Sequence, residues 1–134
     1  MKQIGVGIIG TGWCGGIRAE TCAAHPLVKS LHLAEIRPER LAEMAAKTAA
    51  RTATDDYREL LGPAEVDAVY ISATPETTHY PIARDCLAAG KHVFLEKPIA
   101  LELSEADETT RTPAPWPPRP FIFWRRWRST APCW

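Results

Sequence analysis

The sequence has no excess of charge of either sign and no long hydrophobic run. Among its 134 residues, 16 lysines and arginines balance 16 aspartates and glutamates, so the average charge does not favour a nucleic-acid partner or a membrane surface. No apolar stretch approaches the roughly 18 residues that a membrane-spanning helix needs. We therefore expect neither a nucleic acid nor a membrane as partner. At this length we expect one domain rather than a two-domain enzyme.

Paired cysteines are also missing. The four cysteines include no C-x-x-C pair and no metal-ligand spacing, so we expect no bound metal. The N-terminus lacks a charged and then apolar leader, and we expect a reducing, cytoplasmic setting in which cysteines act as small apolar residues. Cys14 differs from the other three because it lies within a glycine-rich loop.

That glycine-rich loop lies between an apolar segment and a predicted helix. Residues 2–9 are predicted to form a buried strand, and the helix follows the loop. The glycines Gly10, Gly12 and Gly15 form the pattern G-x-G-x-x-G. In this context the first glycine makes a tight turn, the second lets the backbone approach a diphosphate, and the third lets helix and strand pack closely. By itself the pattern also fits an ordinary glycine-rich turn.

An acidic residue follows at the spacing expected of a dinucleotide-binding fold. Glu35 stands at the end of a strand predicted at residues 31–36, twenty positions after Gly15. An acid there hydrogen-bonds the adenosine ribose, and it favours NAD because it would repel the extra phosphate of NADP. Arg37 keeps NADP open as an alternative, since an arginine can receive that phosphate. An ordinary surface glutamate and arginine are the other interpretation.

Strands and helices alternate along the rest of the chain. Helices are predicted at residues 38–50, 57–61 and 76–89, and strands at residues 52–54, 66–73 and 92–95. Such βαβ units predict an α/β fold, a Rossmann-type doubly wound parallel sheet with strand order 3-2-1-4-5. Ligands of these sheets bind at the carboxyl ends of the strands. The glycine loop, Glu35, Thr74–Pro75 and Glu96–Pro98 are all expected at that edge.

Three further segments carry a specific resemblance. They are Ala73-Thr74-Pro75 with His79 four residues later, Ala88-Ala89-Gly90-Lys91-His92-Val93, and Glu96-Lys97-Pro98-Ile99-Ala100. On these motifs, residues 3 to about 108 resemble the N-terminal domain of the Gfo/Idh/MocA oxidoreductases. The resemblance implies hydride transfer between NAD or NADP and a hydroxyl-bearing carbon of a sugar, cyclitol or similar polyol. It also implies a second α+β domain, which is not recognisable in this sequence.

The resemblance further implies which residues contact the cofactor. The glycine loop would hold the diphosphate, Glu35 would lie at the adenosine ribose, and the other motifs would lie toward the nicotinamide. The residues expected at the dinucleotide are Gly10, Thr11, Gly12, Trp13, Cys14, Gly15, Glu35, Arg37, Thr74, Pro75, His79, Glu96, Lys97 and Pro98.

Lys97 is the candidate catalytic residue. By resemblance it lies beside the nicotinamide ribose and reaches toward the substrate, and an ammonium group near a carbonyl stabilises developing alkoxide charge. The bond before Pro98 is often cis in this family. The alternatives are a solvated lysine at a strand end and an ordinary surface histidine at His79.

The composition changes abruptly after residue 108. Residues 109–134 hold half of the prolines, four of the five tryptophans and five arginines with no acid. We therefore predict a Rossmann domain at 1–108 and an aberrant, disordered tail at 109–134, whose prolines prevent a helix. Our hypothesis is that the tail is an out-of-frame reading of the gene, because a shifted frame replaces its Pro-Trp and Phe-Trp codons with alanine and leucine codons. Alternatives are an idle end, or a membrane-surface or single-stranded nucleic-acid segment at 124–128.

Three functional hypotheses follow. The first is an NAD(P)-dependent dehydrogenase whose gene continues into a second domain, this truncated chain being inactive alone because it scarcely positions a substrate. The second is a nucleotide-binding remnant without turnover, and the third is an interaction module that acts through the tail. We also expect self-association through exposed sheet surface.

Overall fold

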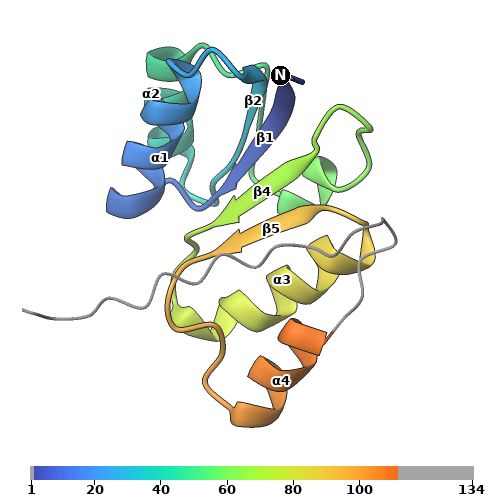
Figure 1. The fold of residues 1–134 in the computed structure, drawn as a ribbon. Helices are drawn as coiled ribbons and strands as arrows, with labels where there is room; N and C mark the ends of the chain where they lie inside the picture. The colour runs from blue at the N-terminus through green and yellow to red at the C-terminus, as the bar shows by residue number, and fades with distance from the viewer. Residues whose placement is uncertain (1, 112–134) are drawn as a thin grey trace, which may run out of the picture.

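A computed structural model describes residues 2–111, and in these residues one five-stranded parallel sheet lies between helices (Figure 1). The strands are β1 (Ile4–Ile9), β2 (Val28–Ala34), β3 (Thr52–Thr54), β4 (Ala68–Ile71) and β5 (His92–Leu95). The helices are α1 (Trp13–Ala23), α2 (Pro38–Thr48), α3 (His79–Ala88) and α4 (Leu103–Arg111), with 3-10 turns η1 (Tyr57–Leu60) and η2 (Glu76–Thr78). The strand order is β3-β2-β1-β4-β5, so the predicted α/β Rossmann topology is confirmed.

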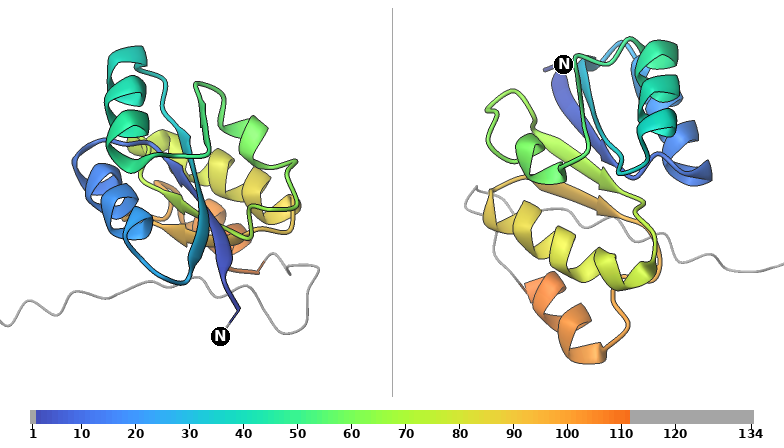
Figure 2. Two further views of the ribbon diagram at one scale, coloured as in Figure 1. Left: turned by 90° about the horizontal axis from the view of Figure 1, so that it is seen from above. Right: turned by 180° about the vertical axis from the view of Figure 1, so that it is seen from behind.

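The path of the chain creates a crevice beside β1. From β1 the chain moves outward to β2 and β3, and it then returns to place β4 against the other side of β1. The direction of winding therefore reverses between β1 and β4, which is where open α/β sheets bind ligands. Helices α1 and α2 cover one face of the sheet, and α3 and α4 lie on the other (Figure 2).

Each face of the sheet has its own hydrophobic core. Alternate side chains of a strand point to opposite faces, so Val6 and Ile8 of β1 pack on the α1 and α2 side with Met44. On the opposite face, Ile71 of β4 packs with Leu87 of α3 and with other side chains of the η1 and α3 layer. Each fully buried aliphatic side chain contributes about 1.5–3 kcal/mol, and these two cores hold the carboxyl ends of the strands in place.

Several element boundaries differ from the sequence-based expectations. β2 begins at Val28 rather than at residue 31, because its pairing with β1 includes Val28 opposite Ile4 despite the polar residues that follow Val28. The segments expected to be helical at 57–61 and at 76–78 form 3-10 turns. Asp56 caps the first of them, with its carboxylate accepting from the backbone N–H of Arg58 at 2.9 Å.

The last described element extends past the predicted domain boundary. α4 ends at Arg111 rather than near residue 108, and the first proline of the following segment is Pro113. The hydroxyl of Thr109 donates to the backbone carbonyl of Glu105 at 2.8 Å in its final turns. Predictions for residues 112–134, including the frame-shift hypothesis and the tail-mediated binding, lie outside the described residues.

Candidate functional site

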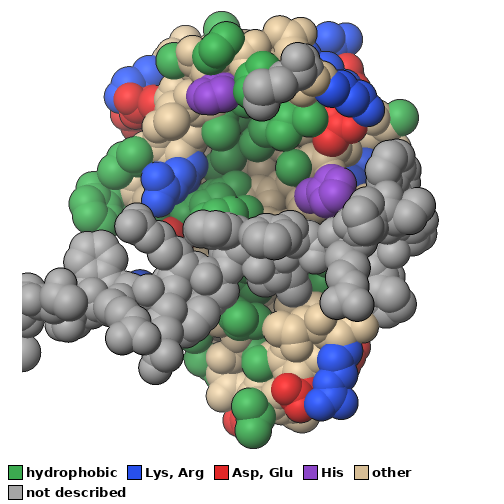
Figure 3. Space-filling model, in the orientation of Figure 1, with side chains coloured by type: hydrophobic (Ala, Val, Ile, Leu, Met, Phe, Trp, Pro, Cys, Tyr) green, Lys and Arg blue, Asp and Glu red, His purple; other side chains and the backbone are tan. Residues whose placement is uncertain are grey.

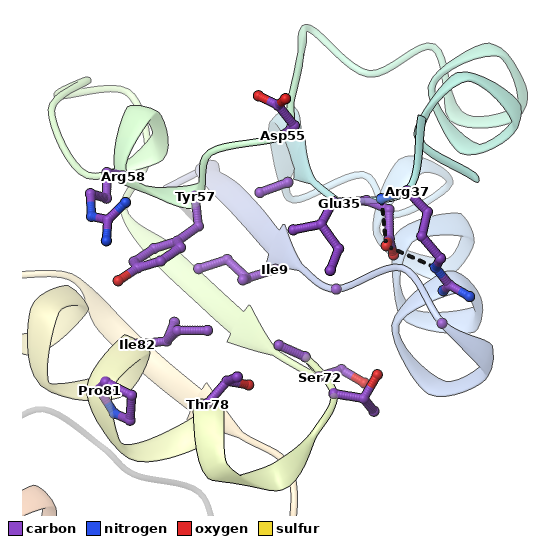
Figure 4. A pocket seen from close by; sticks show the side chains of 16 residues that line it. Ile9, Glu35, Arg37, Asp55, Tyr57, Arg58, Ser72, Thr78, Pro81 and Ile82 are labelled. Carbon is purple, nitrogen blue, oxygen red and sulfur yellow. Dashed lines mark hydrogen bonds and ion pairs between the residues drawn. The ribbon is translucent and has the colours of Figure 1, made fainter. Parts of the chain in front are cut away.

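A cavity of about 480 Å³ opens where β1, β2 and β4 end (Figure 4). Five of the residues selected from the sequence line it together, namely Gly10, Gly12, Glu35, Arg37 and Thr74. Side chains from α3 and from the segment after β3 complete its walls. The predicted convergence of the glycine loop, the end of β2 and the end of β4 at one edge is therefore present.

The three glycines of the loop differ in their surroundings. Gly10 has a φ of +83°, and a Cβ there would lie 2.7 Å from the Cα of Ala73. A Cβ on Gly15 would lie 1.9 Å from the carbonyl oxygen of Gly10, so this glycine permits the close approach of α1 to the loop. A Cβ on Gly12 would meet nothing within 4 Å, and Gly12 lines the cavity.

Gly12 leaves open space at the start of α1. Gly12 is the N-cap of α1 and makes no side-chain hydrogen bond there, so the first-turn amides have no partner from a capping side chain. A helix N-terminus with free amides and a glycine backbone is the arrangement that binds phosphate groups. The residues present therefore fit the diphosphate of a dinucleotide.

Glu35 is held firmly at the end of β2, with 5% of its surface exposed. One carboxylate oxygen accepts from the backbone N–H of Thr11 at 2.8 Å and from its hydroxyl at 3.0 Å. The other accepts from the backbone N–H of Arg37 at 3.2 Å and from its Nε at 3.1 Å. Burial by itself raises the pKa of Glu35, but these hydrogen bonds outweigh it and lower the pKa below its ordinary value.

Glu35 thus links the glycine loop to the end of β2. Thr11 is fully buried, and its N–H is directed to Glu35 rather than to the cavity. Arg37 pairs with the same carboxylate while its own side chain remains 58% exposed. The dashed lines of Figure 4 mark this pair beside the cavity.

The opposite wall contains an aromatic residue that the sequence analysis did not select. Tyr57 of η1 lines the cavity, and its hydroxyl donates to Asp85 of α3 at 2.8 Å. The guanidinium of Arg58 lies 5.1 Å from the centre of the Tyr57 ring. Burial, with Asp85 beside the hydroxyl, raises the pKa of Tyr57 to about 12. Its position just after β3 was the available signal, because the carboxyl end of every parallel strand faces the same edge.

The Glu96-Lys97-Pro98 segment lies at the end of β5 and is held through Glu96. The hydroxyl of Tyr70 donates to one oxygen of Glu96, and the other oxygen accepts from the backbone N–H of Lys97 at 3.3 Å. The Tyr70 ring stacks on Phe94 at 4.9 Å. Burial, together with the hydrogen bond to Glu96, raises the pKa of Tyr70 to about 12.

Lys97 itself is exposed, and within residues 2–111 its ammonium group has no hydrogen bond or ion pair. The peptide bonds Thr74–Pro75 and Lys97–Pro98 are both cis, the second as the family resemblance implies. An exposed, unpaired ammonium at the carboxyl edge suits a group that acts on a bound molecule. Its catalytic role stays a prediction.

His79 is buried rather than on the surface, with 3% of it exposed. Nδ1 lies 2.7 Å from the carbonyl oxygen of Pro98, and Nε2 lies 2.9 Å from that of Ala73. The alternative interpretation of an ordinary surface histidine is therefore wrong. Both ring nitrogens face protein carbonyls, so the ring lies between two loops.

The remaining candidates do not line the cavity. Trp13, the first residue of α1, is 80% exposed, and Cys14 beside it is partly buried. The predicted residues that do not line the cavity are Thr11, Trp13, Cys14, Gly15, Pro75, His79, Glu96, Lys97 and Pro98. Their contacts with a cofactor stay predictions.

The A-G-K-H-V motif has a structural role at the opposite edge of the sheet. Gly90 adopts a φ of +72° after α3, which suits glycine at a helix end. The buried ammonium of Lys91 donates to the carbonyl oxygens of Pro63 at 2.9 Å and Val66 at 3.0 Å. The motif therefore fixes the approach to β4 and β5 and takes no part in the cavity.

In residues 2–111 no helix has the length and apolar character needed to cross a membrane.

Comparison with known proteins agrees with this geometry. Residues 4–114 match the profile of the Gfo/Idh/MocA family, described as an oxidoreductase family with an NAD-binding Rossmann fold. The chain belongs to this family. Myo-inositol 2-dehydrogenase of Thermotoga maritima is 35% identical over 102 residues, which are 76% of this chain and 30% of that protein.

Solved structures of Gfo/Idh/MocA relatives superpose well on this chain. Scyllo-inositol dehydrogenase from Lactobacillus casei, with bound NAD(H) and scyllo-inositol, has a TM-score of 0.76 at 30% identity and covers 83% of this chain and 33% of its own. A 3-ketoreductase from Actinomadura kijaniata in complex with NADP has a TM-score of 0.71 at 29% identity, covering 81% of this chain and 34% of its own. The chain thus spans about a third of the length of these relatives. It carries the NAD(P)-binding Rossmann domain of the family.

Proposed function

We propose that the chain binds a nicotinamide dinucleotide along the carboxyl edge of its sheet. The adenosine occupies the cavity between Glu35 and Tyr57, the diphosphate lies on Gly12 and the first turn of α1, and the nicotinamide end extends toward Lys97. The observation that carries this proposal is the open space at Gly12, which is placed between the cavity and the start of α1.

The cofactor preference is proposed to be NAD. The Glu35 carboxylate has a lowered pKa and stays charged, so it repels the additional phosphate of NADP. Arg37 is engaged with that carboxylate, which leaves less of its charge for a phosphate. NADP remains the alternative, because Arg37 and Arg58 both line the cavity.

In the longer family protein, the proposed activity is hydride transfer to or from a hydroxyl-bearing carbon of a sugar, cyclitol or related polyol. When bound, the nicotinamide supplies or accepts the hydride. Lys97 would hold the substrate oxygen by donating a hydrogen bond from its ammonium group, which stabilises negative charge on that oxygen. Glu96 and Pro98 fix the backbone on either side of Lys97.

Calorimetric titration of the full chain with NADH, NADPH and ADP tests the binding proposal. We expect saturable binding of NADH and weaker binding of NADPH. Tyr57→Ala removes an adenosine wall and is expected to weaken NADH and ADP about tenfold, which corresponds to about 1.4 kcal/mol. Tyr80→Ala is the matched control, because Tyr80 pairs with Glu108 at the surface. Absence of NADH binding by the folded wild-type chain would refute the proposal.

A nucleotide-binding protein without turnover is the second candidate. The cavity and the glycine loop support dinucleotide binding whether or not turnover follows. Incubation of the chain with NAD and a panel of cyclitols and sugars separates the two candidates. Formation of NADH shows turnover, whereas saturable binding with no NADH formed supports binding alone.

A further inference from the structure

We propose that His79 is a positioning residue that joins the two loops at the nicotinamide end of the site and so sets the position of Lys97. The inference rests on the proposed dinucleotide site. It gives His79 an indirect role, acting on Lys97 through the backbone, in place of a direct contact with the cofactor.

The geometry at His79 connects two segments that are far apart in the sequence. Its Nε2 lies 2.9 Å from the carbonyl oxygen of Ala73, which follows β4 and precedes Thr74–Pro75. Its Nδ1 lies 2.7 Å from the carbonyl oxygen of Pro98, the residue after Lys97. A carbonyl oxygen only accepts hydrogen bonds, so a neutral ring donates to one of these two carbonyls through its single N–H and lies against the other.

The ring is attached to a rigid element. His79 is the first residue of α3, and α3 packs on the sheet through Ile82, Ala83 and Cys86, all of which are buried in the core shared with β4 and β5. The imidazole is itself buried, with 3% exposed. The buried ring, placed between the two carbonyls, therefore fixes both loops relative to the sheet rather than only relative to each other.

This arrangement fixes the position of the Lys97 backbone. Glu96 on its N-terminal side is held by the Tyr70 hydroxyl, and Pro98 on its C-terminal side is held by His79. Within residues 2–111 no side-chain partner holds the Lys97 ammonium, so the backbone determines where it lies. Loss of the His79 link frees the backbone at Pro98, on the C-terminal side of Lys97.

The test compares ligands that reach Lys97 with one that does not. NADH extends to the nicotinamide end, whereas ADP carries only the adenosine and the diphosphate. We expect His79→Gln to weaken NADH binding about tenfold in calorimetric titration and to leave ADP binding within about twofold. His79→Asn places an amide N–H near the position of Nδ1, so it should keep the Pro98 link and recover most of the NADH affinity.

Controls separate this role from general stability. His92→Gln changes an exposed histidine at the far end of β5 and should alter neither affinity. An equal loss of ADP and NADH affinity in His79→Gln would mean a structural role only and would overturn the inference, as would unchanged NADH binding. If the wild-type chain binds neither ligand, the proposed function itself fails, which is a different result from loss in the variants.

If the variants do not fold, a measurement on the wild-type chain still tests the inference. Imidazole ¹⁵N–¹H spectra, assigned through the His79→Asn variant or by selective labelling, should show a hydrogen-bonded, slowly exchanging proton on a ring nitrogen of His79. A ring proton that exchanges as fast as that of an exposed histidine would contradict the link and overturn the inference.

Discussion

His32 lies in the middle of β2 with none of its surface exposed. Its Nδ1 is 3.1 Å from the hydroxyl of Thr52, and its Nε2 is 3.0 Å from that of Ser30. A hydroxyl donates or accepts, so the neutral ring satisfies both nitrogens. Burial lowers the pKa of His32 below its ordinary value of 6.5, and Arg51 and Lys29 add to this against an opposing effect of Glu65. The folded protein therefore resists protonation of this ring.

The lowered pKa of His32 predicts that the folded protein loses stability in mild acid. Below its ordinary pKa of 6.5, His32 binds a proton in the unfolded chain but not in the folded one, so the free energy of unfolding falls as the pH decreases. Urea unfolding at a series of pH values measures this slope. His32→Gln keeps hydrogen-bonding groups but does not titrate, and it should flatten the slope below the ordinary pKa of 6.5. An unchanged slope in the variant would refute the prediction.

At the scale of elements, the loop between β1 and α1 contains glycines with different roles, one in stability and one in the proposed ligand binding. Gly15 faces the backbone of Gly10, where a Cβ would come within 1.9 Å of a carbonyl oxygen. Gly12 faces open space at the cavity. The same pattern of glycines therefore contains one position that the fold needs and one that we assign to a ligand.

Matched substitutions test this separation. Gly15→Ala should destabilise the protein by about 1–3 kcal/mol, because the loop and α1 must move apart. Gly12→Val should change stability by less than about 0.5 kcal/mol and weaken ADP binding at least about tenfold. Thermal melts and ADP titrations of both variants provide the measurements. A Gly12→Val protein that binds ADP like the wild type would show that no diphosphate lies there.

At the scale of the whole molecule, hydrophobic side chains reach the surface in several places. In the space-filling view they gather near the middle of the face over β1 and β4 (Figure 3). Trp13 and Leu103 are each 80% exposed. Within the described residues, β3 and β5 pair with a neighbour on one side only, and unpaired strand edges and apolar patches promote association.

We therefore predict concentration-dependent self-association of the full chain. Light scattering coupled to size-exclusion chromatography should show a mean mass above that of the monomer, and the excess should grow with concentration. Leu101→Glu combined with Leu103→Glu removes two exposed leucines and should lower the mean mass. Glu102→Gln, between them, is the control. A monodisperse monomer at every concentration would contradict the prediction.

Local patterns in the sequence determined the element types, the sheet order and the edge where the site lies. Strand and helix periodicities are properties of neighbouring residues, and the right-handed crossover rule reduces their alternation to a few topologies, which include the observed one. The sequence also predicted that Glu35 and residues 96–98 lie at the same carboxyl edge, because each directly follows or ends a predicted parallel strand.

Only the tertiary structure decided which side chains meet at that edge. Thr11 binds Glu35 across 24 positions, Tyr57 binds Asp85 across 28, and His79 reaches Pro98 across 19. Such pairs depend on how the loops after the strands fold against one another and against α3, and no local periodicity encodes those distances. The sequence placed His79 near the site, but packing of α3 on the sheet turned its ring between two backbone carbonyls.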